Sequence, residues 1–158
     1  MSAMSEFTTR AAVDSIRAAF SSSVHPGTSQ LLAAQYTDDG LDLVNAFGAR
    51  HWSELQVREL FENRDGIWSL TPAGYRFYLP AFMIEALSGA PESGDIGDAV
   101  LASLRPGDDE QRFRDRISLL TAPERDSIRA FLEAIRASEG AWNRDPSTSP
   151  SGYWFSSP

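Results

Sequence analysis

A chain of 158 residues with 42% hydrophobic content is long enough to bury one core, and its formal net charge is −8. It has no cysteine, which excludes disulfides, thiolate nucleophiles and thiolate metal sites. All 14 basic residues are arginine, so lysine Schiff bases and a P-loop lysine are excluded too. The acidic balance argues against a nucleic-acid partner, because phosphate binding needs a basic face.

The N-terminal residues 1–7 carry neither the basic start nor the apolar run of a secretory signal. No stretch of the sequence approaches the ~20 apolar residues that are needed to cross a bilayer. We therefore expect a cytoplasmic protein with no membrane partner.

The first expected helix covers residues 6–20. Val13, Ile16 and Phe20 fall on one side of it, which is the pattern of an amphipathic helix. A run of serine, proline and glycine at 21–27 ends it.

Three elements with weaker sequence signals follow. Residues 28–36 predict a short helix capped by Thr28 or Ser29, and the apolar spacing of residues 41–47 predicts another. Ser53 stands three positions before Gln56, which is the spacing of a capping box and indicates a further helix start. Residues 67–70 read as a short extended link.

The most informative stretch begins at Thr71, whose hydroxyl can cap a helix with Pro72 in its first turn. Apolar side chains then recur at three- and four-residue steps as far as Ala86, and Gly89 closes the element. Pro80 cannot donate to the Arg76 carbonyl, so we expect this helix to bend or split there.

The C-terminal half predicts three more helices. Residues 95–104 and 113–120 each show helical apolar spacing, separated by a turn at 105–108. Thr121 and Glu124 repeat the capping-box spacing before a clear apolar stripe that ends at Ile135.

The composition changes after residue 138. Residues 139–158 form a polar, linker-like tail that ends in Tyr153, Trp154 and Phe155. These aromatics could bind a groove of the same chain, which we favour, or of another copy or partner. We therefore expect an all-α, compact single-domain bundle of about six or seven helices over residues 1–138, followed by this tail.

The acidic residues are unevenly distributed. Residues 85–110 carry seven carboxylates and one arginine, whereas residues 111–138 carry six arginines and four carboxylates. These segments could pair at the surface, or the first could meet a cationic partner. On the second interpretation the partner-binding residues are Asp95, Asp98, Asp108, Asp109 and Glu110.

Other candidate sites are weak. His25 and His51 are the only histidines, and without cysteine a zinc site would need carboxylates from distant segments. Arg112 and Arg116 lie four positions apart and could hold an anion, although a solvated helix face explains them equally well. We assign no catalytic residue, metal ligand or cofactor.

Three groups of segments resemble a family of small, uncharacterised bacterial proteins. They are Trp52-Ser53-Glu54-Leu55, the stretch from Leu70-Thr71-Pro72 to Tyr78-Leu79-Pro80-Ala81, and the helical segments from Phe113 to Thr121 and from Ile128 to Leu132. The likeness covers roughly residues 10–136, although Gly74 departs from the family pattern. The resemblance implies a compact bacterial protein with a link to toxin–immunity systems and no activity to transfer.

We expect a non-catalytic cytoplasmic binding protein: an immunity protein, or antitoxin, that neutralises a basic bacterial toxin through its acidic surface. One alternative is a small hydrolase or transferase with a site beside Pro80, drawing on Tyr75, Tyr78, His51 and Glu54. The other is a self-associating scaffold that uses the C-terminal aromatics.

Overall fold

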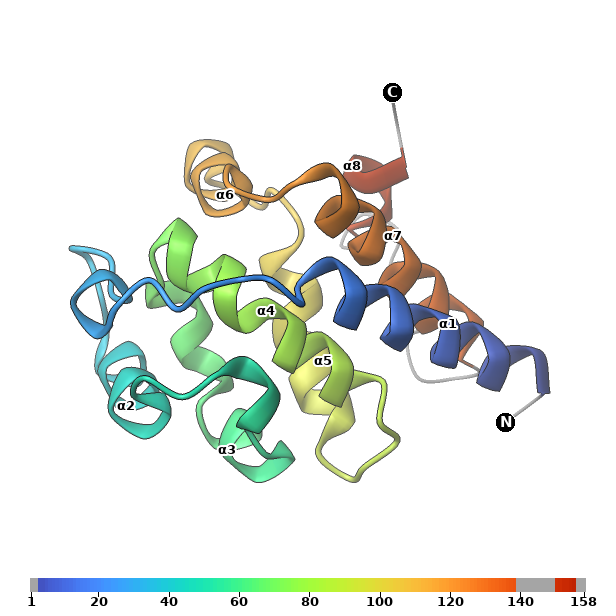
Figure 1. The fold of residues 1–158 in the computed structure, drawn as a ribbon. Coiled ribbons are helices and arrows are strands. Elements are labelled where there is room, and N and C mark those ends of the chain that lie inside the picture. Colours follow the sequence, from blue (N-terminus) through green and yellow to red (C-terminus); the bar gives the residue numbers. More distant parts are fainter. Residues whose placement is uncertain (1–2, 139–149, 156–158) are drawn as a thin grey trace.

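The computed structural model describes residues 3–138 and 150–155, and the regular elements in them are helices (Figure 1). The α-helices are α1 (Ala3–Ala19), α2 (Asp38–Phe47), α3 (Val57–Glu62), α4 (Pro72–Ala86), α5 (Ser93–Ser103), α6 (Glu110–Ile117), α7 (Ala122–Ala137) and α8 (Ser151–Phe155). Short 3₁₀ helices are η1 (Thr28–Gln30), η2 (Trp52–Glu54) and η3 (Arg64–Ser69). Six of the described α-helices have eight or more residues, which confirms the all-α expectation.

Helix α4 is the centre of the fold. It contacts α1, α3, α5, α6 and η2 (Figure 1). Most of its side chains are buried. Its start is as expected, because the Thr71 hydroxyl accepts a hydrogen bond from the Gly74 amide at 3.0 Å. The helix continues through Pro80 as one element, so it is not split at that residue.

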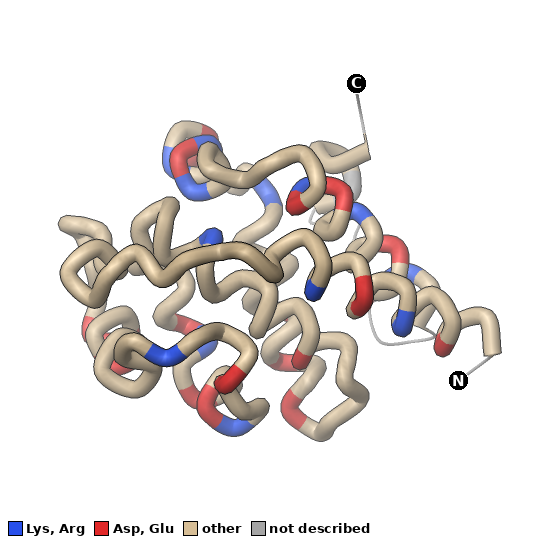
Figure 2. Tube along the Cα trace, in the orientation of Figure 1, with Lys and Arg blue, Asp and Glu red and all other residues tan. Residues whose placement is uncertain are grey.

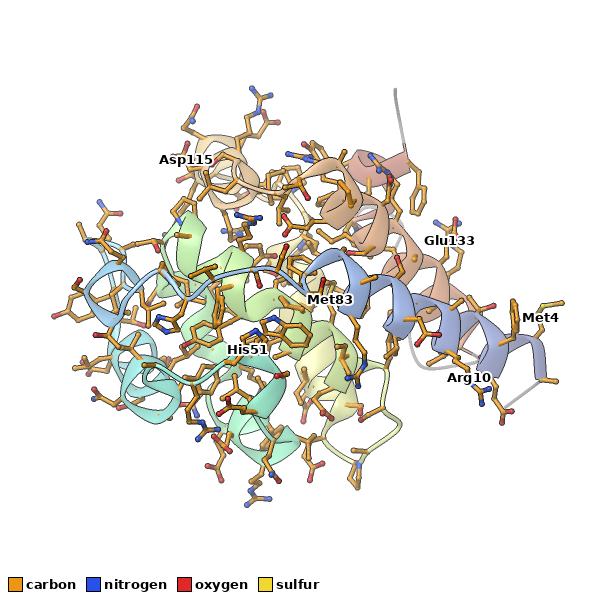
Figure 3. The ribbon with its side chains drawn as sticks, viewed as in Figure 1. Met4, Arg10, His51, Met83, Asp115 and Glu133 are labelled. Carbon is orange, nitrogen blue, oxygen red and sulfur yellow. The ribbon has the colours of Figure 1, made fainter. Side chains whose placement is uncertain are left out.

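Helix α7 packs along α1 and has the predicted capping box. The Thr121 amide donates to Glu124 Oε1 at 2.9 Å, and the Glu124 amide donates to the Thr121 hydroxyl at 3.3 Å. Ile16 of α1 is fully buried and completes the core on this side, whereas Met4 and Arg10 of the same helix point outward (Figure 3).

The helix expected at 28–36 is wrong beyond Gln30. Residues 31–33 instead run antiparallel to residues 69–71: the Thr71 amide donates to the Leu31 carbonyl, and the Ala33 amide donates to the Ser69 carbonyl, both at 2.8 Å. Gly74 fits this pairing, because a Cβ there would lie only 3.0 Å from the Leu31 carbonyl oxygen.

Two other local predictions are also wrong. Ser53 does not cap a helix, because its hydroxyl lies 2.8 Å from His51 Nδ1, and α3 begins only after Gln56. The stretch 67–69 belongs to η3 rather than to an extended link, although the Ser69 carbonyl and Leu70 take part in the short pairing with residues 31–33.

The C-terminal aromatics pack on their own chain. Trp154 is 2% exposed, and its indole N–H donates to the Leu104 carbonyl at 2.7 Å. The Tyr153 ring meets Phe113 edge-on at 4.9 Å. The polar segment 139–149 lies outside the described residues. None of the helices in the described ranges is long and apolar enough to cross a membrane.

Candidate functional site

The structure places Asp95 and Asp98 on the exposed side of α5. Helix α5 packs against α3 and η3, and α2 packs against η3. Figure 2 shows acidic positions on α2, α3 and α5 along the same side of the molecule. We define the acidic edge by six of the exposed carboxylates on α2, α3, η3 and α5: Asp38, Asp39, Glu62, Asp65, Asp95 and Asp98.

The sequence alone did not point to four members of the acidic edge. Residues 38–69 carry seven carboxylates and three arginines, a local excess that could have been counted. The sequence alone could not show that η3 and α3 pack against α5. Two of the arginines are engaged locally: Arg50 pairs with Glu59, and Arg58 donates to Glu62 at 2.9 Å.

The other three predicted residues, Asp108, Asp109 and Glu110, lie where α6 begins. Asp109 caps α6, because its carboxylate accepts the Arg112 amide at 3.0 Å. Glu110 lies 3.5 Å from Arg114 of the same helix. Asp95 stands about 12 Å along α5 from its C-terminal end, so Asp95 and Asp98 lie on a different element from the three residues at the start of α6.

The side chains proposed for the alternative hydrolase site form hydrogen bonds with different groups. The Tyr75 hydroxyl lies 2.8 Å from Ser103 Oγ on α5, whereas the Tyr78 hydroxyl donates to the Gly48 carbonyl at 3.1 Å beside His25. His51 accepts from the Ser53 amide. Burial raises the pKa of Tyr75, and it raises the pKa of Tyr78 to about 12 although the charge of Arg50 opposes it, so both phenols stay protonated at neutral pH.

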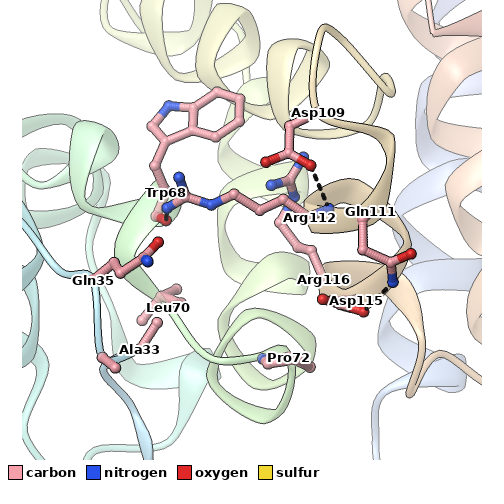
Figure 4. Close-up of a pocket in the computed structure, with 11 residues that line it drawn as sticks. Ala33, Gln35, Trp68, Leu70, Pro72, Asp109, Gln111, Arg112, Asp115 and Arg116 are labelled. Atoms are coloured by element: carbon pink, nitrogen blue, oxygen red, sulfur yellow. Dashed lines mark hydrogen bonds between the residues drawn. The ribbon is translucent and has the colours of Figure 1, made fainter.

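A ligand-sized cleft of about 440 Å³ lies between η3 and α6 (Figure 4). Its apolar wall comes from the segment before α2 and from the start of α4, and its polar wall comes from α6. The residues that define it best are Ala33, Leu70, Pro72, Trp68, Arg112 and Arg116. A second hollow of about 320 Å³ adjoins it and shares Trp68, Asp109, Arg112 and Arg116.

Arg112 spans this cleft. Its Nη2 donates to the Trp68 carbonyl at 2.8 Å, so the side chain crosses from α6 to η3 in front of Arg116 (Figure 4). Trp68 itself is 37% exposed. A large aromatic side chain that is partly open to solvent beside two guanidinium groups is a feature of binding sites rather than of a packed core.

Arg116 is buried although it is charged. It is 7% exposed, its Nε and Nη2 donate to the Ser103 carbonyl at 3.1 and 2.8 Å, and its guanidinium stacks on Trp68 at 4.9 Å from the ring centroid. Within the described residues it forms no ion pair. Burial lowers the pKa of Arg116, with Tyr75 and Asp109 opposing that shift.

The interpretation of Arg112 and Arg116 as a solvated helix face is wrong for Arg116, which is buried, whereas Arg112 is exposed. Both residues line the cleft. No cluster of three or more histidine and carboxylate side chains that could hold a metal ion occurs in the part of the chain that the structure describes.

The fold and these sites define an all-α protein with an acidic edge and a separate arginine–tryptophan cleft. The chain belongs to a family of unknown function, DUF6714, whose model matches residues 9–157. The match includes the C-terminal aromatics as well as the helices of the core. No curated protein and no solved structure matches the chain.

Proposed function

We propose that this chain is a non-catalytic, cytoplasmic binding protein that recognises a basic protein partner, and that it acts as an immunity protein against a basic toxin. The observation that carries the proposal is the acidic edge. The whole chain carries a net charge of −8, and at this edge four neighbouring elements contribute exposed carboxylates. Such a surface quickens the encounter with a cationic protein and disfavours partners of like charge.

The location of the charges favours the predicted residues of α5 over those at the start of α6. Asp95 and Asp98 are exposed on α5, which packs against α3 and η3, the elements that carry Glu62 and Asp65. Asp109 caps α6, and Glu110 lies 3.5 Å from Arg114 of that helix, so both lie at the start of α6 rather than on the elements of the acidic edge. We therefore propose that the partner contacts Asp95 and Asp98 directly, and that Asp108, Asp109 and Glu110 contribute at the rim.

Affinity also needs apolar anchors, because exposed ion pairs contribute little on their own. Leu41 and Tyr36 provide exposed apolar area at α2, with 39% and 51% of their surfaces accessible. Leu41 lies in the same helix as Asp38 and Asp39. An exposed apolar anchor on the same element as carboxylates is the arrangement expected of an interface with a basic partner.

Affinity capture from the native bacterial lysate at moderate salt tests this proposal. The wild-type chain is compared with an edge variant, Glu62→Gln/Asp65→Asn/Asp95→Asn/Asp98→Asn, and with a control of equal charge, Glu6→Gln/Asp14→Asn/Asp126→Asn/Glu133→Gln. We expect a stoichiometric basic protein to be retained by the wild type and the control, and lost from the edge variant. Equal retention by all three chains would contradict the proposal.

A further inference from the structure

The cleft between η3 and α6 has a property that the acidic edge does not explain: it contains a guanidinium without a carboxylate partner. Arg116 is 7% exposed and forms no ion pair with any described residue. A buried cation costs several kcal/mol unless it is paired and hydrogen-bonded. The structure keeps this charge at a position where burial already lowers its pKa.

Only some of the N–H donors of Arg116 are engaged in hydrogen bonds. Nε and Nη2 both donate to the same acceptor, the Ser103 carbonyl. The Tyr75 phenol is a further acceptor for Arg116: it donates to Ser103 Oγ, which itself donates to the Val100 carbonyl, and its oxygen accepts from the guanidinium. Because guanidinium has five N–H donors, this side chain can still bind an acceptor. Arg116 lines both adjoining hollows, so an acceptor can reach it from the cleft.

A carboxylate is the acceptor that fits best. The planar fork of arginine binds carboxylates through two parallel hydrogen bonds, and the bond is stronger where water is excluded. Arg112 lies in front of Arg116 and is bound to the Trp68 carbonyl by a single hydrogen bond, so it can turn toward the same ligand (Figure 4).

The charges around the cleft restrict the ligand further. Asp109 and Asp115 line it together with Arg112 and Arg116, so two carboxylates balance two guanidinium groups. Asp109 accepts the Arg112 amide, and Asp115 accepts a hydrogen bond from Gln111 at 2.8 Å. A multiply charged anion would be repelled by these carboxylates. A ligand that carries one carboxylate and one ammonium group can pair with the guanidinium groups through the first and with the carboxylates through the second.

The apolar wall indicates the rest of the ligand. Trp68 presents a partly exposed indole, and Ala33, Leu70 and Pro72 lie on the same side of the cleft. Aromatic rings stack favourably on such a surface, and the volume of about 440 Å³ is in the range of small-molecule sites.

We propose that this cleft binds an aromatic α-amino acid or a molecule of the same zwitterionic class. The carboxylate lies on Arg116 and Arg112, the ammonium group faces Asp109 and Asp115, and the aromatic body packs against Trp68. None of the residues that define the acidic edge lines the cleft, so this site is distinct from that edge, although Asp109 belongs both to the cleft and to the rim of the proposed partner interface.

The test is a titration followed by NMR of the Trp68 indole N–H, with L-phenylalanine as the probe. Phenylalaninamide lacks the carboxylate, and N-acetyl-L-phenylalanine lacks the ammonium group. We expect saturable binding of L-phenylalanine with a Kd on the order of 1 mM or below, and binding of each derivative weakened by about tenfold or more.

Two matched variants locate the site. Arg112→Gln should weaken L-phenylalanine binding by about tenfold, whereas Arg114→Gln, on the same helix but outside the cleft, should leave it unchanged. Both residues are exposed, so both variants should fold. Arg116→Gln is a third variant and should abolish binding.

Several results would overturn the proposal. They are the absence of binding by L-phenylalanine at roughly 10 mM, binding of phenylalaninamide as tight as that of L-phenylalanine, or equal losses in the Arg112 and Arg114 variants. Equal binding of N-acetyl-L-phenylalanine would overturn the ammonium contact. None of these results depends on the partner at the acidic edge.

Discussion

The Nε atom of Arg76 lies 2.9 Å from Oε1 of Glu124, and this pair ties the central helix α4 to the first turn of α7. Glu124 is 1% exposed, and the same oxygen accepts the Thr121 amide that closes the capping box. One carboxylate thus satisfies a helix end and a guanidinium from another helix. Because it is buried, its two partners replace the water that it loses.

Replacing Glu124 should therefore lower the free energy of unfolding by more than the loss of an ordinary helix cap does. We expect Glu124→Ala to lower the free energy of unfolding by about 3 kcal/mol, and Glu124→Gln by about 1–2 kcal/mol, because glutamine keeps the capping box without the charge. Urea denaturation measures both changes. Arg76→Gln in the Glu124→Ala background should add little further loss, and additive losses would show that the two side chains are not coupled.

The close approach of α2 to η3 predicts the effect of Gly40→Ala. A Cβ at residue 40 would overlap the Cβ and hydroxyl of Ser69, so η3 would have to move. Alanine favours a helix by about 1 kcal/mol over glycine, yet we expect a net destabilisation of about 1–3 kcal/mol.

Gly94 on α5 is the matched control for that substitution. A Cβ there meets nothing within 4 Å, so Gly94→Ala should be neutral or stabilise the protein. Thermal melting of the two variants compares them. If Gly40→Ala were as stable as Gly94→Ala, α2 could not pack against η3 as closely as described above.

The phenol of Tyr78 predicts how stability depends on alkaline pH. Its pKa is raised to about 12 in the folded protein against a usual value of 10.0, chiefly because of burial. Between these values the unfolded chain loses its proton first, so the stability contributed by the neutral phenol is complete below pH 10 and is lost as the pH rises toward 12.

The melting temperature should accordingly fall between pH 10 and pH 12, because the Tyr78 phenol then contributes about 1–3 kcal/mol less to the free energy of unfolding. Tyr75 has a pKa raised in the same direction and adds to the slope. Tyr78→Phe should flatten the dependence. An unchanged slope in Tyr78→Phe would assign the effect to other groups.

The C-terminal helix α8 should contribute to the stability of the bundle. Trp154 is buried, its indole donates to the Leu104 carbonyl, and its own carbonyl accepts from Arg129 Nε at 2.8 Å. We expect Trp154→Ala to cost about 3 kcal/mol and Phe155→Ala, whose ring is 40% exposed, to cost less than about 1 kcal/mol.

The same variant distinguishes the intramolecular contact from the scaffold alternative. If α8 binds its own chain, Trp154→Ala lowers stability at every protein concentration and leaves the sedimentation coefficient of the folded protein unchanged. A large oligomer in the wild type that dissociates in Trp154→Ala would favour self-association through this segment.

The sequence predicted the elements that carry their own local signals. Thr71 with Pro72, and Thr121 with Glu124, specify helix starts through neighbouring residues alone, and both are confirmed. The prediction at Ser53 was wrong because the Ser53 hydroxyl forms a hydrogen bond with the ring of His51, two positions earlier, instead of capping a helix. Residues 31–33 were misjudged because their extended form depends on pairing with residues 69–71, which are distant in sequence.

The sites were harder to predict for the same reason. The spacing of Arg112 and Arg116 is compatible with an exposed helix face, and only the packing of α6 on α4 and beside Ser103 decides that one guanidinium is buried. The acidic residues of η3 and α3 were visible in the sequence, but their position beside α5 was not.

The most direct test of the acidic edge uses the lack of lysine. A zero-length carbodiimide joins carboxylates to amines, and this chain has no side-chain amine, so side-chain cross-links formed in the native lysate lead to other proteins. Mass spectrometry then identifies the carboxylates that reacted. We predict that cross-links to one basic partner concentrate on Glu62, Asp65, Asp95 and Asp98 and persist when Glu6, Asp14, Asp126 and Glu133 are neutralised. Cross-links spread evenly over all exposed carboxylates, or none above background, would contradict the account.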